Sequence, residues 1–257
     1  MKNQQKQHHT VDLDSFEYVS LYQLIPSGTG MGQSHLKTLV DSVHNGSANI
    51  KSLLISCKEG ARVHGSAFIR ALGIDNYNQI DGSMLNPAAG LHQFFAVRKH
   101  EAHLITNADE LSQLVQLPIC NILTNQQFSL YNYLKQGPDI FAVHGLVVMT
   151  TNNIKKVPDP ILSCFSHIVE LEDYTPTQLE LIILQRLKYA HIEHKNDCIL
   201  KNIVRYGNNN LAQSIRFLRL CIAVMQADGR QVLIPTDVMK ASRLNRLAAL
   251  PGDDIPF

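Results

Sequence analysis

Short apolar runs alternate with amphipathic segments over residues 31–173. The runs have the length of buried strands, and they fall at residues 53–56, 102–106, 145–150 and 168–171. The segments between them have helical patterns, at residues 33–43, 66–72, 91–97 and 128–135. Strands that alternate with helices in this way predict a parallel α/β sheet with helices on both faces.

From Thr175 onward the pattern predicts helices only. Pro176 suits a first helical turn and Thr175 suits its N-cap. Helices are therefore expected at 176–190, 198–206, 211–227 and 235–249. The third carries a stripe of apolar residues at helical spacing, made of Leu211, Ile215, Leu218, Ile222 and Met225. We interpret this stripe as the core of a separate all-α domain.

These two patterns divide the 257 residues into four parts. Residues 1–30 are a polar N-terminal arm, 31–173 an α/β base domain, 174–250 a helical domain, and 251–257 an acidic and apolar C-terminal tail. Two domains suit this length, because single cores stop growing at about 250–300 residues.

The first predicted strand leads through a short loop into a helix, over residues 53–64, where a phosphate-binding loop would lie. Such loops need glycines, a lysine that neutralises phosphate charge and a hydroxyl that holds magnesium. Of these only Gly60 is present, while Val63 stands at the lysine position and His64 at the hydroxyl position. Lys58 and Arg62 are alternative charge partners for a passively bound nucleotide, but we favour the interpretation that they are solvated loop charges.

A second nucleotide motif ends an apolar strand with two carboxylates, for the metal and for water activation. Residues 105–111 (ITNADEL) match its frame, but Thr106 and Asn107 replace both carboxylates. Residues 151–153 (TNN) follow the next strand, where a polar side chain would sense the terminal phosphate.

In order and spacing these motifs resemble the AAA+ family, most closely the bacterial Holliday-junction branch-migration motors and the clamp-loader subunits. The resemblance begins at residues 31–33 (MGQ) and includes residues 173–179 (DYTPTQL), which are similar to the start of the motor's helical lid. It implies an AAA+-like parallel sheet followed by an all-α lid. It also places Cys164 where an arginine would reach the neighbouring subunit, and Asn210 where the sensor-2 arginine would lie. ATP hydrolysis is therefore not expected.

The chain ends in Asp253, Asp254, Ile255, Pro256 and Phe257. This segment resembles the tip of bacterial single-stranded-DNA-binding proteins, which docks onto repair and replication enzymes. A terminal Phe can fill an apolar pocket while the carboxylates meet basic groups. The alternatives are an ordinary acidic end and a tail that packs on its own lid. A weaker match, of residues 127–131 (QFSLY) to a sliding-clamp peptide, is interpreted as packing.

The five cysteines contain no C-x-x-C pair, which favours a reducing compartment. One cluster has metal-like spacing, with His191 and His194 on neighbouring positions of a predicted helix end, followed by Asp197 and Cys198. Histidines at a helix end also suit the helix dipole, and we expect no metal and no cofactor.

The formal net charge of +1 and the pI near 7.7 predict weak or absent direct nucleic-acid binding. Residues 1–10 lack the apolar region of a signal peptide. No window approaches the roughly 18 apolar residues of a membrane-spanning helix. We expect a cytoplasmic protein, or one held at a membrane through a complex.

These observations predict a catalytically inactive scaffold or adaptor subunit of a bacterial multi-protein machine, with DNA handling as the favoured pathway. Its partners would be proteins of a hetero-oligomeric complex, including enzymes that recognise single-stranded-DNA-binding protein tails. The alternative is a structural adaptor in a type IV secretion or conjugation coupling complex.

Overall fold

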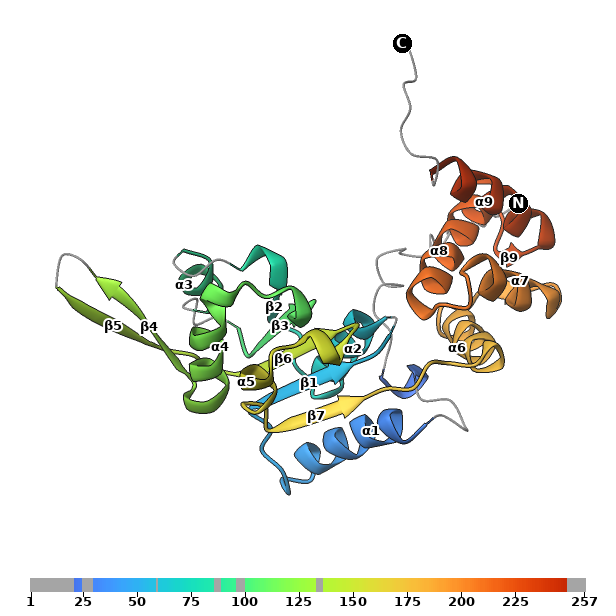
Figure 1. The fold of residues 1–257 in the computed structure, drawn as a ribbon. Helices are drawn as coiled ribbons and strands as arrows, with labels where there is room; N and C mark the ends of the chain where they lie inside the picture. The colour runs from blue at the N-terminus through green and yellow to red at the C-terminus, as the bar shows by residue number, and fades with distance from the viewer. Residues whose placement is uncertain are drawn as a thin grey trace, which may run out of the picture. The chain divides into compact units, whose positions relative to one another are not determined.

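The structure, a computed structural model, describes residues 21–24, 30–58, 60–85, 89–95, 100–132 and 136–248 (Figure 1). Most of the predicted N-terminal arm and the whole C-terminal tail lie outside these residues. The chain divides into two compact units between Asp173 and Tyr174. We describe each unit by itself.

The base unit is built on a five-stranded sheet in which each pair of neighbouring strands is parallel. Its order is β2-β3-β6-β1-β7, with bounds β1 Ser52–Ser56, β2 Tyr77–Asp81, β3 Ala102–Thr106, β6 Leu146–Thr151 and β7 His167–Glu170. The three central strands are buried at every position because both of their faces are covered. The predicted α/β sheet and its four predicted strands are confirmed. The edge strand β2 was not predicted, because its sequence, YNQID, has no apolar run.

Helices cover both faces of this sheet, with bounds α1 Met31–His44, α2 Ala61–Ala71, α3 Ala89–Phe95, α4 Gln113–Asn125 and α5 Asp159–Leu162. Successive side chains of a strand point to opposite faces of the sheet, so neighbouring residues pack against different helices. Leu104 and Val148 approach Gly65 of α2. Ile105 and Met149 instead share a buried cluster with residues of α3, α4 and α5. The α2 helix begins five residues earlier than the predicted start at Ser66.

The start of α1 is tied to the end of β7. Gln33 is buried and its amide donates a hydrogen bond to the Glu172 carbonyl oxygen at 2.7 Å. A Cβ on Gly32 would lie 2.0 Å from the Glu170 carbonyl oxygen, so only glycine fits there. Residues 31–33, which open the AAA+ resemblance, therefore anchor α1 along the sheet edge (Figure 1).

The helix predicted at residues 128–135 is wrong, because residues 127–132 form a strand. β4 (Gln127–Asn132) pairs antiparallel with β5 (Gly137–Ala142) as a hairpin that extends away from the sheet (Figure 1). Phe128 is opposite Phe141 and the two rings stack at a centroid distance of 5.3 Å. Phe128 and Leu130 alternate with polar residues, and this period of two is typical of a strand. The helix α4 that precedes this strand was not predicted.

The lid unit contains four predicted helices, and all four are confirmed: α6 Pro176–Tyr189, α7 Cys198–Tyr206, α8 Leu211–Ala227 and α9 Pro235–Ala248. Thr175 caps α6 through a capping box, in which Gln178 N–H donates to the Thr175 hydroxyl at 3.3 Å. The stripe along α8 is buried at all five positions, as expected of lid core. The prediction of helices only is wrong, because β8 (Glu193–His194) and β9 (Val232–Leu233) form a short parallel pair.

An ion pair between a partly exposed arginine and a buried aspartate fixes the turn between α8 and α9. Asp237 is fully buried, and its carboxylate accepts hydrogen bonds from the Arg230 guanidinium and from Ile234 N–H, the latter at 2.9 Å. Buried carboxylates need such partners. Within the described ranges, no helix is long and apolar enough to cross a membrane.

Candidate functional site

The loop between β1 and α2 keeps the backbone geometry of a strand-loop-helix turn. Gly60 is the N-cap of α2 and adopts φ 82° and ψ 16°, a left-handed conformation that favours glycine. Its carbonyl oxygen accepts a hydrogen bond from Val63 N–H at 3.0 Å. Val63, at the lysine position, is half-buried and uncharged. The turn is therefore present without the side-chain charge that would bind phosphate.

His64, at the hydroxyl position, is part of the core. It is fully buried, and its Nδ1 lies 3.0 Å from the Gly60 carbonyl oxygen. Burial lowers the pKa of His64 to about 4, although the hydrogen bond to Gly60 opposes this. The neutral ring donates its Nδ1 hydrogen to that carbonyl, and this bond holds the loop to the first turn of α2.

At the end of β3 the two positions that would carry catalytic carboxylates are hydrogen-bonded to β2 and the residues just after it. The buried Thr106 hydroxyl donates to the Ile80 carbonyl oxygen at 3.4 Å. Asn107 adopts φ 54° and its amide donates to an Asp81 carboxylate oxygen at 2.7 Å. Asp81 also accepts from the Ser83 N–H and hydroxyl, at 3.0 and 2.7 Å.

The carboxylate of Asp81 has a pKa below its ordinary value. Partial burial alone would raise this pKa, but hydrogen bonds from Ser83, Asn107 and Thr106 favour the charged form and prevail. Asp81 thus stays ionised at neutral pH. Sequence reasoning missed this residue, although Asp81-Gly82-Ser83 has the composition of an Asx-type turn.

The sensor-1 position, at the end of β6, is also engaged within the base unit. The buried Thr151 hydroxyl donates to an Asp109 carboxylate oxygen at 2.6 Å and accepts from Asn153 N–H at 3.0 Å. The Thr151 carbonyl oxygen accepts from Cys57 N–H at 3.1 Å. The hydroxyl that would approach a terminal phosphate is therefore bonded to a carboxylate.

The two cations near the loop both have protein neighbours. The Arg62 guanidinium lies 2.8 Å (Nε) and 3.2 Å (Nη2) from the Gln79 amide oxygen, with the amide oriented so that its oxygen accepts. Lys58 is largely exposed, and its Nζ lies 4.0 Å from an Asp173 carboxylate oxygen. Arg62 is thus held against β2, whereas Lys58 fits the interpretation of a solvated loop charge.

Two further positions that the AAA+ resemblance singled out lie at helix ends. Cys164, at the arginine-finger position, donates its thiol to the Pro160 carbonyl oxygen at 3.0 Å. Asn210, at the sensor-2 position, is the N-cap of α8 and accepts from Gln213 N–H at 2.9 Å. The structure brings Gly60, Val63, His64, Thr106, Asn107 and Cys164 into the base unit and Asn210 into the lid unit. The predicted partner-binding residues Asp253–Phe257 lie outside the described residues.

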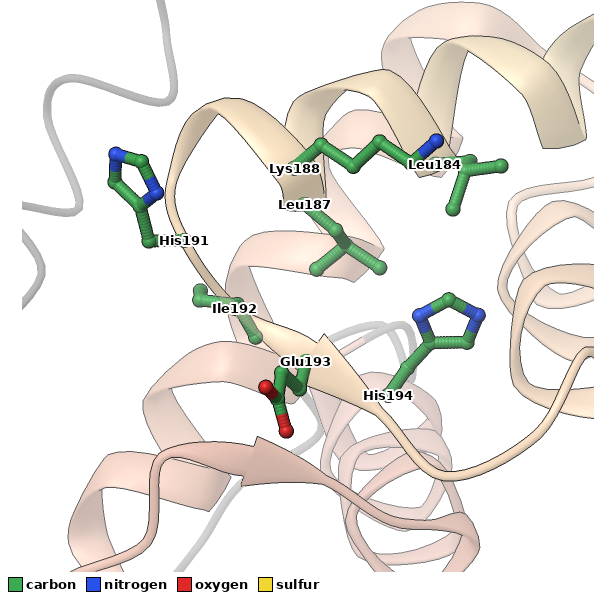
Figure 2. A pocket seen from close by; sticks show the side chains of 7 residues that line it. All are labelled: Leu184, Leu187, Lys188, His191, Ile192, Glu193 and His194. Carbon is green, nitrogen blue, oxygen red and sulfur yellow. The ribbon is translucent and has the colours of Figure 1, made fainter.

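The lid unit contains an open groove of about 510 Å³ beside the end of α6 (Figure 2). Leu184 and Leu187 line it, with the Lys188 side chain extended along the same helix and His194 facing them from β8. His191 points away from His194 in Figure 2. The prediction that the two histidines are neighbours at a helix end is wrong. His191 adopts φ 55° just after α6, and His194 lies in β8. No group of three or more candidate metal ligands occurs in the described part of the chain.

Comparison of the sequence with protein-family models gives no match, and comparison with curated proteins gives none either. The fold, however, is similar to that of solved structures of the Thermotoga maritima RuvB Holliday junction branch migration motor. One superposes with a TM-score of 0.65 at 15% identity, over 89% of this chain and 73% of that chain. A point variant of RuvB gives a TM-score of 0.64 at 16% identity, over 91% and 73%. The chain therefore has an AAA+-like α/β fold of the kind seen in RuvB.

Proposed function

We propose that this chain is a catalytically inactive AAA+-fold subunit that serves as a scaffold or adaptor in a bacterial multi-protein machine. One observation carries the proposal: the polar groups that remain at the nucleotide-site positions are bonded to the base unit itself. His64 is bonded to Gly60, Asn107 to Asp81 and Thr151 to Asp109. A hydrolytic site instead needs donors and metal ligands directed at the phosphates.

DNA handling is the pathway we favour for this adaptor. RuvB, whose fold the chain shares, is a Holliday junction branch migration motor. The tail residues Asp253–Phe257 resemble the docking tip of single-stranded-DNA-binding proteins, which supports partners among repair and replication enzymes. The protein would act in the cytoplasm, or at a membrane through its complex. The secretion-coupling role stays a prediction that no observation here favours.

Catalytic inactivity is tested by phosphate release from the full-length protein with ATP and magnesium. We expect no turnover above background, because each missing group removes orders of magnitude in rate. Thermal melting with and without ATP tests passive binding, and we expect no shift, since a ligand stabilises only the state that binds it. Turnover or a melting shift that disappears in Arg62→Ala would overturn the proposal, and Lys155→Ala, a change in the short 3-10 turn Ile154–Lys156, is the matched control.

The adaptor role is tested by deleting Phe257. If the tail docks, affinity for a tip-recognising repair enzyme should fall at least thirtyfold, because a buried aromatic anchor with a paired carboxylate contributes about 2 kcal/mol. The replacement Asp253→Asn should weaken binding less and lower its salt dependence. Unchanged partner binding together with a lower melting temperature would instead mean that the tail packs on its own lid.

A further inference from the structure

Two cysteines from different helices converge on a single carbonyl oxygen of the base unit. The Cys120 thiol, on α4, donates to the Pro160 carbonyl oxygen at 3.5 Å, and the Cys164 thiol donates to the same oxygen at 3.0 Å. Both residues are partly buried and pack against the core cluster of α3, α4 and α5. Their sulfur atoms are therefore near neighbours, although 44 residues of sequence separate them.

The remaining cysteines have different surroundings. Cys57 and Cys221 are buried, and burial raises the pKa of the Cys221 thiol, which keeps it protonated and unreactive. Cys198 is exposed in the lid unit. Solvent reaches the neighbourhood of the pair, because Leu117, one turn before Cys120 on α4, is 72% exposed.

We propose that Cys120 and Cys164 form a two-thiol redox site that is oxidised to a disulfide by hydroperoxides. The Cys164 thiol gives its proton to solvent and the thiolate attacks the hydroperoxide, so that an S–O bond forms and the O–O bond breaks. The leaving alkoxide or hydroxide takes up a proton from solvent and departs as alcohol or water. The Cys120 sulfur then attacks the sulfenic acid, the S–S bond forms, and the departing hydroxide takes the Cys120 proton as water. Two thiols are oxidised and one hydroperoxide is reduced.

The order of these steps follows from the surroundings of Cys120. Burial, a hydrogen bond with the Cys164 thiol and the charge of its thiolate raise the pKa of Cys120 to about 11. Cys120 therefore keeps its proton at neutral pH and is a poor first nucleophile. Cys164 reacts first and Cys120 resolves the product. The disulfide would join α4 to the segment after α5, at the position that the AAA+ resemblance assigns to a subunit-facing arginine.

The test uses the reduced full-length protein treated with hydrogen peroxide, alkylated, digested and analysed by mass spectrometry. We expect a disulfide-linked peptide pair that contains Cys120 and Cys164, with two of the five thiols lost and both recovered on reduction. Hydrogen exchange at α5 should slow in the oxidised form, because the crosslink restricts opening of that short helix. The absence of this crosslink while Cys198 is oxidised would overturn the proposal without any variant.

Variants separate the two roles. In Cys120→Ser, Cys164 should stop at the sulfenic acid, which a dimedone-type reagent traps. In Cys164→Ser, Cys120 should be labelled about tenfold more slowly than Cys164 is in Cys120→Ser, because burial, the largest cause of the raised pKa of Cys120, persists when Cys164 is replaced. Cys198→Ser is the matched control and should leave the crosslink unchanged. Equal labelling of Cys120 and Cys164 in the two single variants would overturn the assigned order. Since no nucleotide or partner enters this test, its outcome is independent of the adaptor proposal.

Discussion

Replacing Asn107 with Asp would place a carboxylate where the AAA+ resemblance expects one, and it should destabilise the base unit. The Asn107 amide donates to Asp81 at 2.7 Å, so Asn107→Asp removes that donor and places a second carboxylate against the first. The backbone does not oppose the change, because Asp tolerates the φ of 54° found there. The effect is thus electrostatic.

The size of this destabilisation follows from the loss of the Asn107–Asp81 hydrogen bond and from the partial exposure of Asp81. A hydrogen bond to a charged group contributes about 1.5–3 kcal/mol when buried, and Asp81 is only half-buried, so solvent screening reduces this. We expect a loss of about 1–2 kcal/mol in the free energy of unfolding at pH 7. Urea denaturation followed by circular dichroism measures it.

The pH dependence gives the sharper test. In the wild type, the folded-state pKa of Asp81 is lowered, so its contribution is present above the ordinary pKa and is lost on acidification. In Asn107→Asp, two adjacent carboxylates raise the folded-state pKa of the pair. The deficit relative to wild type should therefore be largest at neutral pH and should shrink as the pH falls.

Asn153→Asp is the matched control. The Asn153 side chain is exposed and its oxygen accepts a hydrogen bond from Lys155 N–H at 3.2 Å, so a carboxylate can keep that bond. This variant should unfold within about 0.5 kcal/mol of wild type. If Asn107→Asp behaves like Asn153→Asp, or its deficit grows on acidification, the assigned role of the Asn107–Asp81 bond is refuted.

Three further predictions concern the same unit and its assembly. Since burial lowers the folded-state pKa of His64 to about 4, wild-type stability should fall between about pH 6.5 and 4, and a pH series on His64→Gln should show a smaller fall. Gly65→Ala should lower the free energy of unfolding, measured by urea denaturation, by about 1–3 kcal/mol. The added Cβ would lie 2.7 Å from Thr150 Cγ2 and 2.8 Å from Leu104 Cδ1. Ser66→Ala on the same helix is the control and should change stability little. Light scattering of the isolated chain should show a monomer, since Cys164 offers a neighbouring subunit no charged group, and a stable hexamer would contradict this.

Much of the fold was predictable because the spacing of the apolar residues and the residues typical of helix starts indicated the same elements. The buried strands Ala102–Thr106 and Leu146–Thr151 are near-continuous apolar runs, and Thr175-Pro176 begins α6 with a capping box. The predictions failed where tertiary contacts decide. β2 is polar and depends on pairing with β3. Residues 127–132 form a strand because they pair with the adjacent strand β5 in a hairpin, whereas placement by resemblance had predicted a helix there.

The sequence predicted where the residues of the candidate site lie, but it did not predict which residues they contact. The sequence located Thr106, Asn107 and Thr151, because each follows an apolar strand in a recognisable frame. It did not identify their partners Asp81 and Asp109, which approach only once β2, β3 and β6 lie side by side. Nor did it pair Cys120 with Cys164, since helix α4 had not been predicted and its approach to Pro160 has no local signal.

The internal hydrogen bonds of Asn107 and His64 bear on the stability of the fold in the absence of nucleotide. In a working site, unpaired donors and carboxylates carry a cost of desolvation or repulsion that bound nucleotide and magnesium relieve. Here Asn107 supplies a donor to Asp81, where a second carboxylate would repel it, and neutral His64 closes the loop onto Gly60. These bonds stabilise the base unit by themselves, and in the function that we propose they favour a shape that does not depend on a ligand. An adaptor requires such a constant surface, and this links the local chemistry of the site to the function proposed for the chain.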